Sequence, residues 1–327
     1  MHTDSNQIKQ GHIFLFNHFS RVETFMPQYF IYKETGAYCR SIAASSFFTN
    51  DNHFSNLLSA LGVVPNNHPE LMALLARDIL AGRKIIVFPE GGMVKDRKVL
   101  TDDGDYRIYS RKNDEHRKLH TGAARLAYGL FIFKAVVRNK LKHDRYTNLK
   151  NWADELGFDS VDELEAAAQL PTNIVPANIT FYPLRVNENV LSKGVEYFYK
   201  GLSERLIEEL IIEGNLLLKK TDMDIRCGET FSVDEGMQWH DRMYVKFFAN
   251  KLPNLNSIFD NEYVNSSLAK KLITPGIKRS VNNIRDYYMQ AMYSAVTINS
   301  SHILSVIIFQ LLEKNYAHID IIELKKV

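Results

Sequence analysis

Residues 84–91 read KIIVFPEG, and this stretch decides the fold. A short apolar run with branched side chains predicts a buried strand, and Pro89 ends it because proline cannot donate to a sheet ladder. Glu90 then stands at the carboxyl end of the strand, where open α/β sheets bind ligands. We expect Glu90, Gly91 and Gly92 to line a site. The alternative is a simple turn in which Glu90 is a solvent-facing acid.

A second apolar segment, HIFLF at residues 12–16, predicts another buried strand that runs directly into Asn17 and His18. Glu23 follows His18 five residues later. If the chain turns from strand to helix between them, Glu23 can accept from one ring nitrogen and leave the other free as a base. The alternative is an ordinary surface contact, since 11 His and 38 acidic residues in 327 give about 1.3 chance matches.

The rest of the chain alternates between strand and helix patterns. Further strands are expected at 174–186 and 224–233, and helices at 21–35, 54–61, 70–81, 121–137 and 195–219. Residues 101–118 are rich in Asp, Arg and Lys and predict a solvated loop. This alternation predicts an α/β fold with a mostly parallel central sheet flanked by helices.

The composition excludes several classes of protein. The 327 residues are 45% hydrophobic and carry a net charge of +2, which argues against a dedicated nucleic-acid binder. Two cysteines, Cys39 and Cys227, exclude a disulfide scaffold and a four-Cys zinc site, and we expect both to be buried small residues. The first ten residues are polar and lack the apolar stretch of a signal peptide, so we expect a cytoplasmic protein.

The longest uncharged run, residues 287–312, is long enough to span a bilayer. It contains polar groups such as Gln290, Thr297 and Asn299, which a lipid-facing helix would leave without partners. We therefore expect two buried helices joined near the TINSS segment at 297–301. The alternative for the apolar residues 303–312 is a face that docks on a membrane.

The Asn-His-x4-acid block at residues 17–23, followed about 70 residues later by Phe-Pro-Glu-Gly, resembles the glycerolipid acyltransferases of the PlsC-like superfamily. Three later blocks agree with that family in order and spacing, at residues 120–124 (HTGAA), 174–176 (IVP) and 225–229 (IRCGE). The similarity covers roughly residues 11–233.

The resemblance implies a glycerol-3-phosphate acyltransferase-like core over residues 11–233. Within it, the polar helical pattern of residues 139–170 predicts a helical insertion or a surface cap more than core. A helical C-terminal extension would occupy residues 234–327. The family normally has helical or membrane-associating sequence before its first strand, where this chain has about eleven residues.

The activity implied is that of an O-acyltransferase. It would move a fatty acyl group from acyl-CoA or acyl-ACP to a hydroxyl of glycerol-3-phosphate, lysophosphatidic acid or a related lipid alcohol. His18 would be the general base and Glu23 would orient it. Backbone amides near Asn17 or in the Gly91-Gly92 pair would bind the thioester oxyanion. The resemblance implies no metal and no cofactor besides the acyl co-substrate.

The same resemblance implies the substrate-binding residues. Glu90 would bind an acceptor hydroxyl, and Asn17, Gly91, Gly92 and Pro176 would line the substrate site.

After Pro-Glu-Gly the family commonly has Thr-Arg-Ser, whereas residues 92–94 are Gly-Met-Val, so Lys95 or Arg97 would meet the phosphate or headgroup. Lys84 is a third candidate. The missing arginine motivates an alternative function, a catalytically impaired module on the same fold that binds a lipid or an acyl chain. The partners implied are an acyl-CoA or acyl carrier protein, a lipid acceptor and a membrane surface on which the enzyme sits peripherally, with no nucleic acid.

Overall fold

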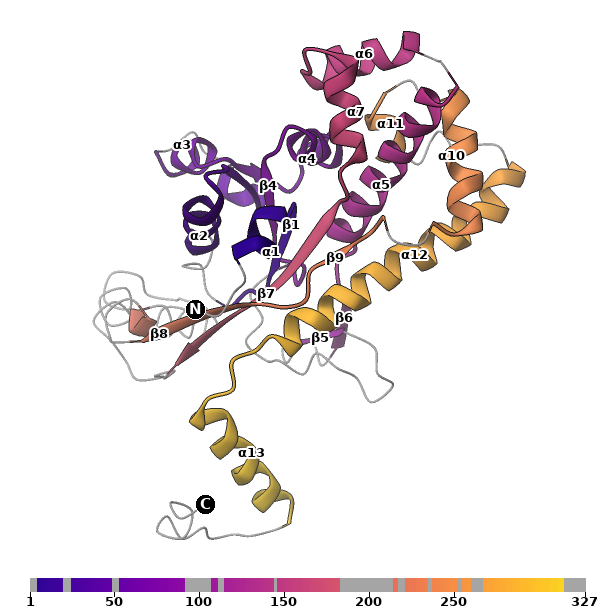
Figure 1. The fold of residues 1–327 in the computed structure, drawn as a ribbon. Helices are drawn as coiled ribbons and strands as arrows, with labels where there is room; N and C mark the ends of the chain where they lie inside the picture. Colours follow the sequence, from indigo (N-terminus) through magenta and orange to yellow (C-terminus); the bar gives the residue numbers. More distant parts are fainter. Residues whose placement is uncertain are drawn as a thin grey trace. The chain divides into compact units, whose positions relative to one another are not determined.

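The computed structural model describes eleven ranges of the chain, shown as ribbon in Figure 1: residues 5–19, 25–48, 53–91, 107–110, 115–143, 146–182, 214–216, 221–234, 237–251, 254–259 and 267–314. The chain divides into two compact units. The first comprises Met1–Ile179 with Ile225–Ala295, and the second comprises Thr180–Asp224 with Val296–Val327.

A mostly parallel sheet forms the centre of the first unit. β1 (Ile13–Phe16) lies between β4 (Lys84–Val87) and β7 (Asn173–Tyr182) and is parallel to both. β2 (Cys39–Ala43) pairs in parallel with β4 on one side and with β3 (Val63–Pro65) on the other. The order β3-β2-β4-β1-β7-β8 requires crossover connections, and helices flank the sheet in Figure 1. The predicted α/β fold class is therefore confirmed.

In the described part of the chain two strands follow β7, where one was expected over residues 224–233. β8 (Asp222–Cys227) lies beside β7, and the two-residue β9 (Phe231–Ser232) pairs antiparallel with the start of β7. Pro176 stands inside β7, the fourth of its ten residues. Its carbonyl accepts from the amide of Gly228 at 2.7 Å. The N and C=O of one strand residue face the same side, so the missing N–H of Pro176 faces away from β1 and leaves that ladder intact.

The strands that were predicted best are those with uninterrupted apolar runs. All four residues of β1 are 0% exposed, which agrees with a strand buried on both faces of a parallel sheet. β2 and β3 were not predicted, because CRSIA mixes polar and apolar residues and VVP is only three residues long. The loop expected at 101–118 is wrong in part, since β5 (Arg107–Ser110) and β6 (Glu115–Lys118) form an antiparallel pair.

The helices that connect these strands begin and end close to the predicted positions. They are α2 (Met26–Thr35), α3 (His53–Ala60) and α4 (Leu71–Leu80), with a 3-10 turn, η2 (Ser45–Phe48), before α3. α4 follows Pro69, as expected of a helix start. Gly82 comes just after it with φ at 85°, a left-handed conformation that glycine adopts at little cost.

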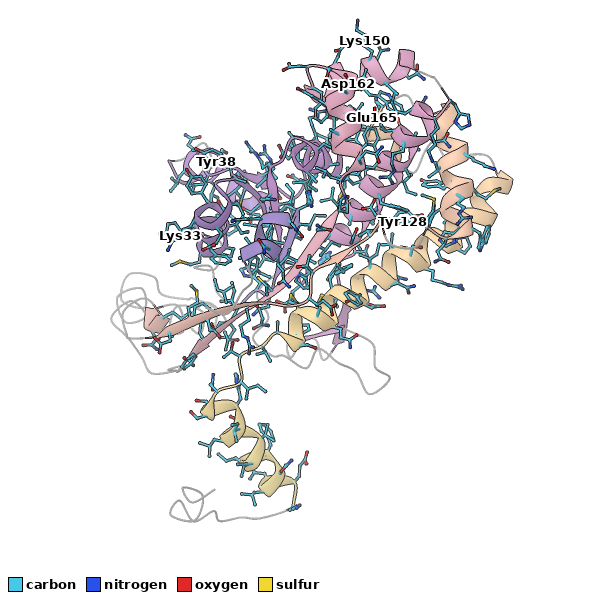
Figure 2. The ribbon with its side chains drawn as sticks, viewed as in Figure 1. Lys33, Tyr38, Tyr128, Lys150, Asp162 and Glu165 are labelled. Atoms are coloured by element: carbon cyan, nitrogen blue, oxygen red, sulfur yellow. The ribbon has the colours of Figure 1, made fainter. Side chains whose placement is uncertain are left out.

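α5 (Gly122–Leu141) is the central helix of the first unit, and most of its side chains are buried. The prediction of a surface cap at residues 139–170 is wrong, although its helical character is confirmed by α6 (Tyr146–Leu156) and α7 (Val161–Gln169). Both helices pack against α5 and bury Trp152 and Leu164 in the core. Their outer faces carry Lys150 and Asp162, which project away from α5 in Figure 2.

Helices from beyond residue 234 complete the same core. α10 (Trp239–Lys251), α11 (Asn256–Phe259) and α12 (Ser267–Ser294) all pack on α5, and α10 and α12 lie beside it in Figure 1. Asp241, 3% exposed in the first turn of α10, accepts from the hydroxyl of Tyr128 on α5 at 2.6 Å. Burial and this hydrogen bond raise the pKa of Tyr128 above its ordinary value, which keeps the phenol protonated as a donor. The expected extension over 234–327 thus shares one compact unit with the core as far as Ala295.

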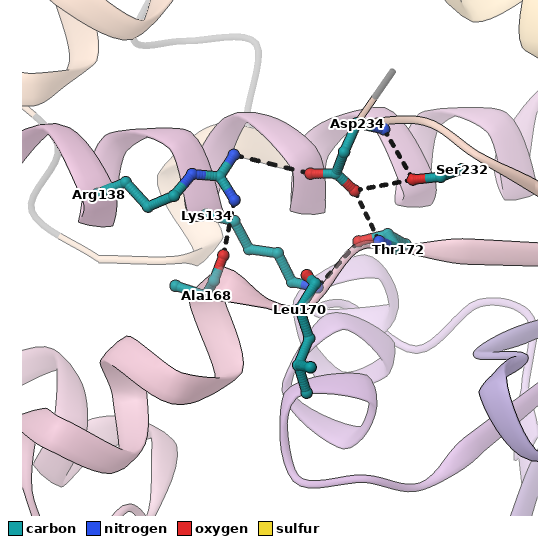
Figure 3. A network of polar contacts seen from close by, with 7 residues as sticks. All are labelled: Lys134, Arg138, Ala168, Leu170, Thr172, Ser232 and Asp234. Carbon is teal, nitrogen blue, oxygen red and sulfur yellow. Dashed lines mark hydrogen bonds and ion pairs between the residues drawn. The ribbon is translucent and has the colours of Figure 1, made fainter.

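A polar network at the start of β7 joins α5 to the segment that precedes β7 and to the turn that follows β9 (Figure 3). The ammonium of Lys134, 1% exposed, donates to the carbonyl of Leu170 at 2.9 Å and to the hydroxyl of Thr172 at 3.0 Å. Arg138 donates to the carbonyl of Ala168 and lies 3.7 Å from Asp234, whose other oxygen accepts from the amide of Thr172. Burial lowers the pKa of Lys134 to about 8.

The second unit contains α13 (Ser300–Glu313), which begins with a capping box at Asn299. The expected break between two helices is confirmed, because α12 ends at Ser294. The expected burial of the second helix is wrong: α13 has no buried residue, and Phe309 is 68% exposed. Among the residues that the structure describes, no helix is long and apolar enough to cross a bilayer.

Candidate active site

The register of the two central strands brings His18 beside Glu90. Ile13 pairs with Ile85, an offset of 72 residues, and the same offset continues past the strand ends to His18 and Glu90. The backbone amide of His18 donates to Oε2 of Glu90 at 2.7 Å. The two motifs, expected at carboxyl ends of strands, therefore meet at one edge of the sheet.

Phe88 packs against the His18 imidazole. The two ring centroids lie 4.7 Å apart with the planes tilted by 36°, and Phe16 lies 6.4 Å from Phe88 on the other side. His18 is partly exposed, whereas Phe16 is fully buried. The strand ends thus hold one side of the imidazole against an aromatic ring and leave part of it open to a ligand.

Glu90 is 0% exposed, so the alternative of a solvent-facing acid is excluded. Its Oε2 accepts from the His18 amide, and its Oε1 accepts from the hydroxyl of Tyr293 on α12. Both carboxyl oxygens of Glu90 therefore accept a hydrogen bond, one from each side of the site. These contacts make Glu90 an organiser of the loop that carries His18. Its expected contact with an acceptor hydroxyl stays a prediction.

Asn17 joins β1 to β7 through a pair of hydrogen bonds. Its Nδ2 donates to the carbonyl of Ile179 at 3.1 Å, and its Oδ1 accepts from the amide of Ile179 at 2.6 Å. The side chain is 0% exposed and continues the ladder past the last paired residue of β1. The structure therefore shows Asn17 fixing the base of the His18 loop, and its expected part in substrate binding stays a prediction.

The turn from Phe88 to Gly91 is closed by a hydrogen bond from the amide of Gly91 to the carbonyl of Phe88 at 3.1 Å. Pro89 occupies the second position of this turn, where its fixed φ is favoured. Gly91 has φ at 67°, and a Cβ there would lie 2.1 Å from Cδ2 of His120. The His120 ring therefore packs directly on the backbone of the Pro-Glu-Gly turn, and a Cβ at Gly91 would displace it.

The expected oxyanion donors are partly occupied by these contacts. The amide of His18 donates to Glu90, and the amide of Gly91 donates to Phe88, so neither points to a free position. The amide of Gly92 lies outside the described residues.

Lys84 does not belong to the site. Its ammonium donates to the carbonyls of Lys9 and Gly11, at 2.9 and 2.5 Å, at the end of α1 (Ser5–Gln10). Lys84 is the first residue of β4, so it lies at the opposite end of that strand from Glu90. Burial lowers its pKa, and its hydrogen bonds explain how the buried charge is tolerated. The suggestion that Lys84 meets a phosphate is therefore corrected.

Other predicted site residues are placed differently or not at all. Pro176 is buried and paired with Leu15, in the strand that carries Ile179, and its expected contact with substrate stays a prediction. Glu23, Gly92, Lys95 and Arg97 all lie outside the described residues. It therefore stays a prediction that Glu23 orients the His18 imidazole. It also stays a prediction that Lys95 or Arg97 binds the phosphate or headgroup.

A pocket of about 700 Å³ lies at the end of β8 and beside α12. Its described lining includes Arg226, Cys227 and Gln290, but neither His18 nor Glu90. Cys39 is buried as expected, whereas Cys227 is only partly buried. Among the described residues no group of three His, Cys, Asp or Glu could hold a metal ion.

A comparison with protein families finds one match, to the family described as Acyltransferase, over residues 1–137. This segment belongs to the acyltransferase family. The matched range contains the PlsC-like acyltransferase domain, with both strand-end motifs and the His18–Glu90 contact. A search among curated proteins finds no match to the chain. The matched domain supports a general acyltransferase activity, and the blocks expected at 174–176 and 225–229 lie beyond it.

Two contributors to the site were not found from the sequence. Tyr293 lies in a stretch whose composition predicts only packing, and its partner Glu90 is 203 residues away. His120 was noted as part of the HTGAA block, but its contact with Gly91 was not expected. The one available signal for His120 is that it stands just before α5, where the family resemblance placed a basic residue.

Proposed function

We propose that this acyltransferase moves a fatty acyl group from a thioester of coenzyme A or acyl carrier protein to a hydroxyl of glycerol-3-phosphate, lysophosphatidic acid or a related lipid alcohol. The observation that carries the proposal is the meeting of His18 and Glu90 at the carboxyl ends of β1 and β4, inside the acyltransferase domain. The imidazole is held against Phe88 and is partly exposed, as a general base must be.

In the proposed reaction His18 takes the proton of the acceptor hydroxyl as its oxygen attacks the thioester carbonyl. The new C–O bond forms, the C–S bond breaks, and the departing thiolate receives the proton from the imidazolium. Among the contacts described for His18 there is no cysteine, and the proposed mechanism uses no covalent acyl-enzyme. Glu23 would fix the ring tautomer by accepting from the second nitrogen.

The test is a transfer assay with acyl-CoA and acyl-ACP donors against a panel of acceptors, with the acylated product measured by mass spectrometry. Product mass is preferable to released thiol, because the chain has two free cysteines of its own. We expect His18→Ala to lose about 10²- to 10⁴-fold in rate. His143→Ala is the matched control, because His143 is exposed near the end of α5 and contacts the carbonyl of Asn139.

Near-wild-type turnover by His18→Ala would remove His18 from the mechanism. A folded wild-type protein that binds lipid or acyl chains but transfers to no acceptor would instead support the alternative of a binding module.

Peripheral attachment to a membrane is part of the same proposal, and α13 supports it. Its residues 300–312 carry no charge, and Ile303, Val306 and Phe309 are 56%, 57% and 68% exposed. Apolar side chains of this kind bind at the interface of a bilayer. In flotation with vesicles of phosphatidylcholine and phosphatidylglycerol, we expect Phe309→Glu to reduce binding more than Gln310→Glu, which adds the same charge at a polar position. Equal binding by both variants and the wild type would remove α13 from the proposal.

A further inference from the structure

The hydroxyl of Tyr293 reaches into the acyltransferase site from a helix outside the matched domain. It donates to Oε1 of Glu90, whose other oxygen holds the backbone amide of His18 at 2.7 Å. One buried carboxyl group therefore connects α12 to the loop of the expected general base. The domain match ends at residue 137, so the family comparison does not assign any role to Tyr293.

The end of α12 that carries Tyr293 is fixed in place by contacts on three sides. Nδ2 of Asn178, on β7, donates to the carbonyl of Met292 at 3.2 Å. The hydroxyl of Tyr288 donates to the carbonyl of His120 at 3.3 Å. Met289 and Met292 are both 0% exposed. Because these contacts leave this turn of α12 little freedom, the Tyr293 hydroxyl is presented to Glu90 from a rigid element.

A hydrogen bond to Oε1 has a consequence for His18 because the two carboxyl oxygens are joined. Rotation or displacement of the Glu90 side chain would carry Oε2 away from the His18 amide. The amide belongs to the residue whose imidazole must stand within hydrogen-bond distance of the reacting hydroxyl, and a shift of about 1 Å can cost about 10²-fold in rate. Holding Oε1 therefore helps to hold the position of His18.

We propose that Tyr293 is a positioning residue for acyl transfer, which acts through Glu90 on the backbone of His18. The inference rests on the proposed function, in which His18 is the general base. It extends the functional unit of the enzyme from the matched domain to the end of α12. It also gives the described part of the C-terminal region a role in the reaction beyond covering the core.

The test compares Tyr293→Phe with the wild type in the full chain. We expect kcat to fall by at least about tenfold, because a displacement of His18 by about 1 Å can cost about 10²-fold in rate. The KM for the acyl donor should change less than about twofold, because the proposed action of Tyr293 runs through Glu90 and the position of His18. Tyr287→Phe is the matched control, since Tyr287 lies on the same helix with its ring packed on Phe231 and no hydrogen bond to the site. Thermal unfolding of each variant measures whether it is fully folded at the assay temperature.

A double-mutant cycle separates positioning through Glu90 from a general effect on the fold. In the Glu90→Gln background the side-chain amide has only one acceptor oxygen and cannot accept from both Tyr293 and His18, so Tyr293→Phe should change kcat less than about twofold. If Glu90→Gln does not fold, His18→Ala is the second background. There the base is absent, and its position no longer affects the residual rate.

Three results would overturn the inference: a kcat of Tyr293→Phe within twofold of the wild type, an equal loss in Tyr287→Phe, or full additivity with the background mutation. Each of these leaves the proposed function standing as long as His18→Ala remains inactive. Conversely, an active His18→Ala enzyme would remove the proposed mechanism whatever the behaviour of Tyr293→Phe.

Discussion

Gly91→Ala tests the structure of the Pro-Glu-Gly turn. The substitution should lower the free energy of unfolding through two separate effects, one on the backbone and one on a neighbouring side chain. Gly91 has φ at 67°, and an L-residue in the left-handed region costs about 1–2 kcal/mol. The added Cβ would also stand 2.1 Å from Cδ2 and 2.3 Å from Nε2 of His120, so the imidazole must leave its position. A side chain forced off its preferred rotamer costs about 0.5–1.5 kcal/mol. Together the two costs lower the free energy of unfolding by about 1.5–3.5 kcal/mol.

Gly82→Ala is the matched control for the backbone part. Gly82 has φ at 85°, and a Cβ there would meet nothing within 4 Å. Gly82→Ala should therefore lower the free energy of unfolding only through the backbone conformation. The stabilisation that alanine gives by reducing the entropy of the unfolded chain is the same at both positions. The free energy of unfolding, measured in urea, should therefore fall about 1 kcal/mol further for Gly91→Ala than for Gly82→Ala.

His120→Ala should remove that difference, because the steric obstacle is then absent. We expect the double variant Gly91→Ala with His120→Ala to lose only about 1–2 kcal/mol relative to His120→Ala alone. Equal stabilities for Gly91→Ala and Gly82→Ala, or an unchanged cost of Gly91→Ala in the absence of His120, would refute the described contact. The transfer assay on the same proteins reports whether the turn also positions Glu90.

Asn17→Ala should lower the free energy of unfolding by about 2–4 kcal/mol, because it leaves the buried amide and carbonyl of Ile179 without partners, and an unchanged urea midpoint would contradict this. Burial lowers the pKa of His12 to about 3, below its unfolded value of 6.5, so its contribution to stability is full above pH 6.5 and is lost as the pH falls toward 3. The urea midpoint of His12→Gln should therefore fall less than that of the wild type between pH 7 and pH 4; parallel decline would argue against a buried neutral imidazole. Lys134 has its pKa lowered by burial to about 8, so the unfolded state binds more protons above that pH and stability should rise from pH 8 to pH 10. Lys134→Met should lack this rise in urea titrations, and an identical slope would refute it.

The parts of the fold that were predicted from the sequence are those determined by local apolar patterns. The apolar runs at 12–16 and 84–88 contain β1 (Ile13–Phe16) and β4 (Lys84–Val87), and burial on both faces is what a central parallel strand receives. β2 forms because β4 and β3 offer it hydrogen-bonding partners on both sides, which its own sequence does not reveal. Likewise, the charged residues of 107–118 predict a solvated loop, although a two-stranded pair is compatible with solvent.

In the candidate site, too, the residues that follow local motifs were predicted, and the contacts between distant segments were not. His18 and Glu90 were found because each follows a recognisable strand. The register that brings them together follows from the pairing of β1 with β4. The bonds of Asn17 to Ile179 and of Glu90 to Tyr293 join segments 162 and 203 residues apart, and no pattern in a single sequence reports such a contact. Trp152 was misjudged for a related reason, since the polar residues around it conceal the one face that packs on α5.

The pairing of β1 with β7 also bears on how the chain is made. Asn17 and Ile179 are separated by 162 residues, which a ribosome adding about 5–20 residues per second takes roughly 8–30 s to synthesise. During that interval the β7-facing edge of a fully apolar strand has no partner, and such an edge is prone to pair with other chains. Nascent chains of this enzyme should therefore depend on chaperones that shield strand edges, and slower translation through residues 137–179 should lower the yield of soluble protein.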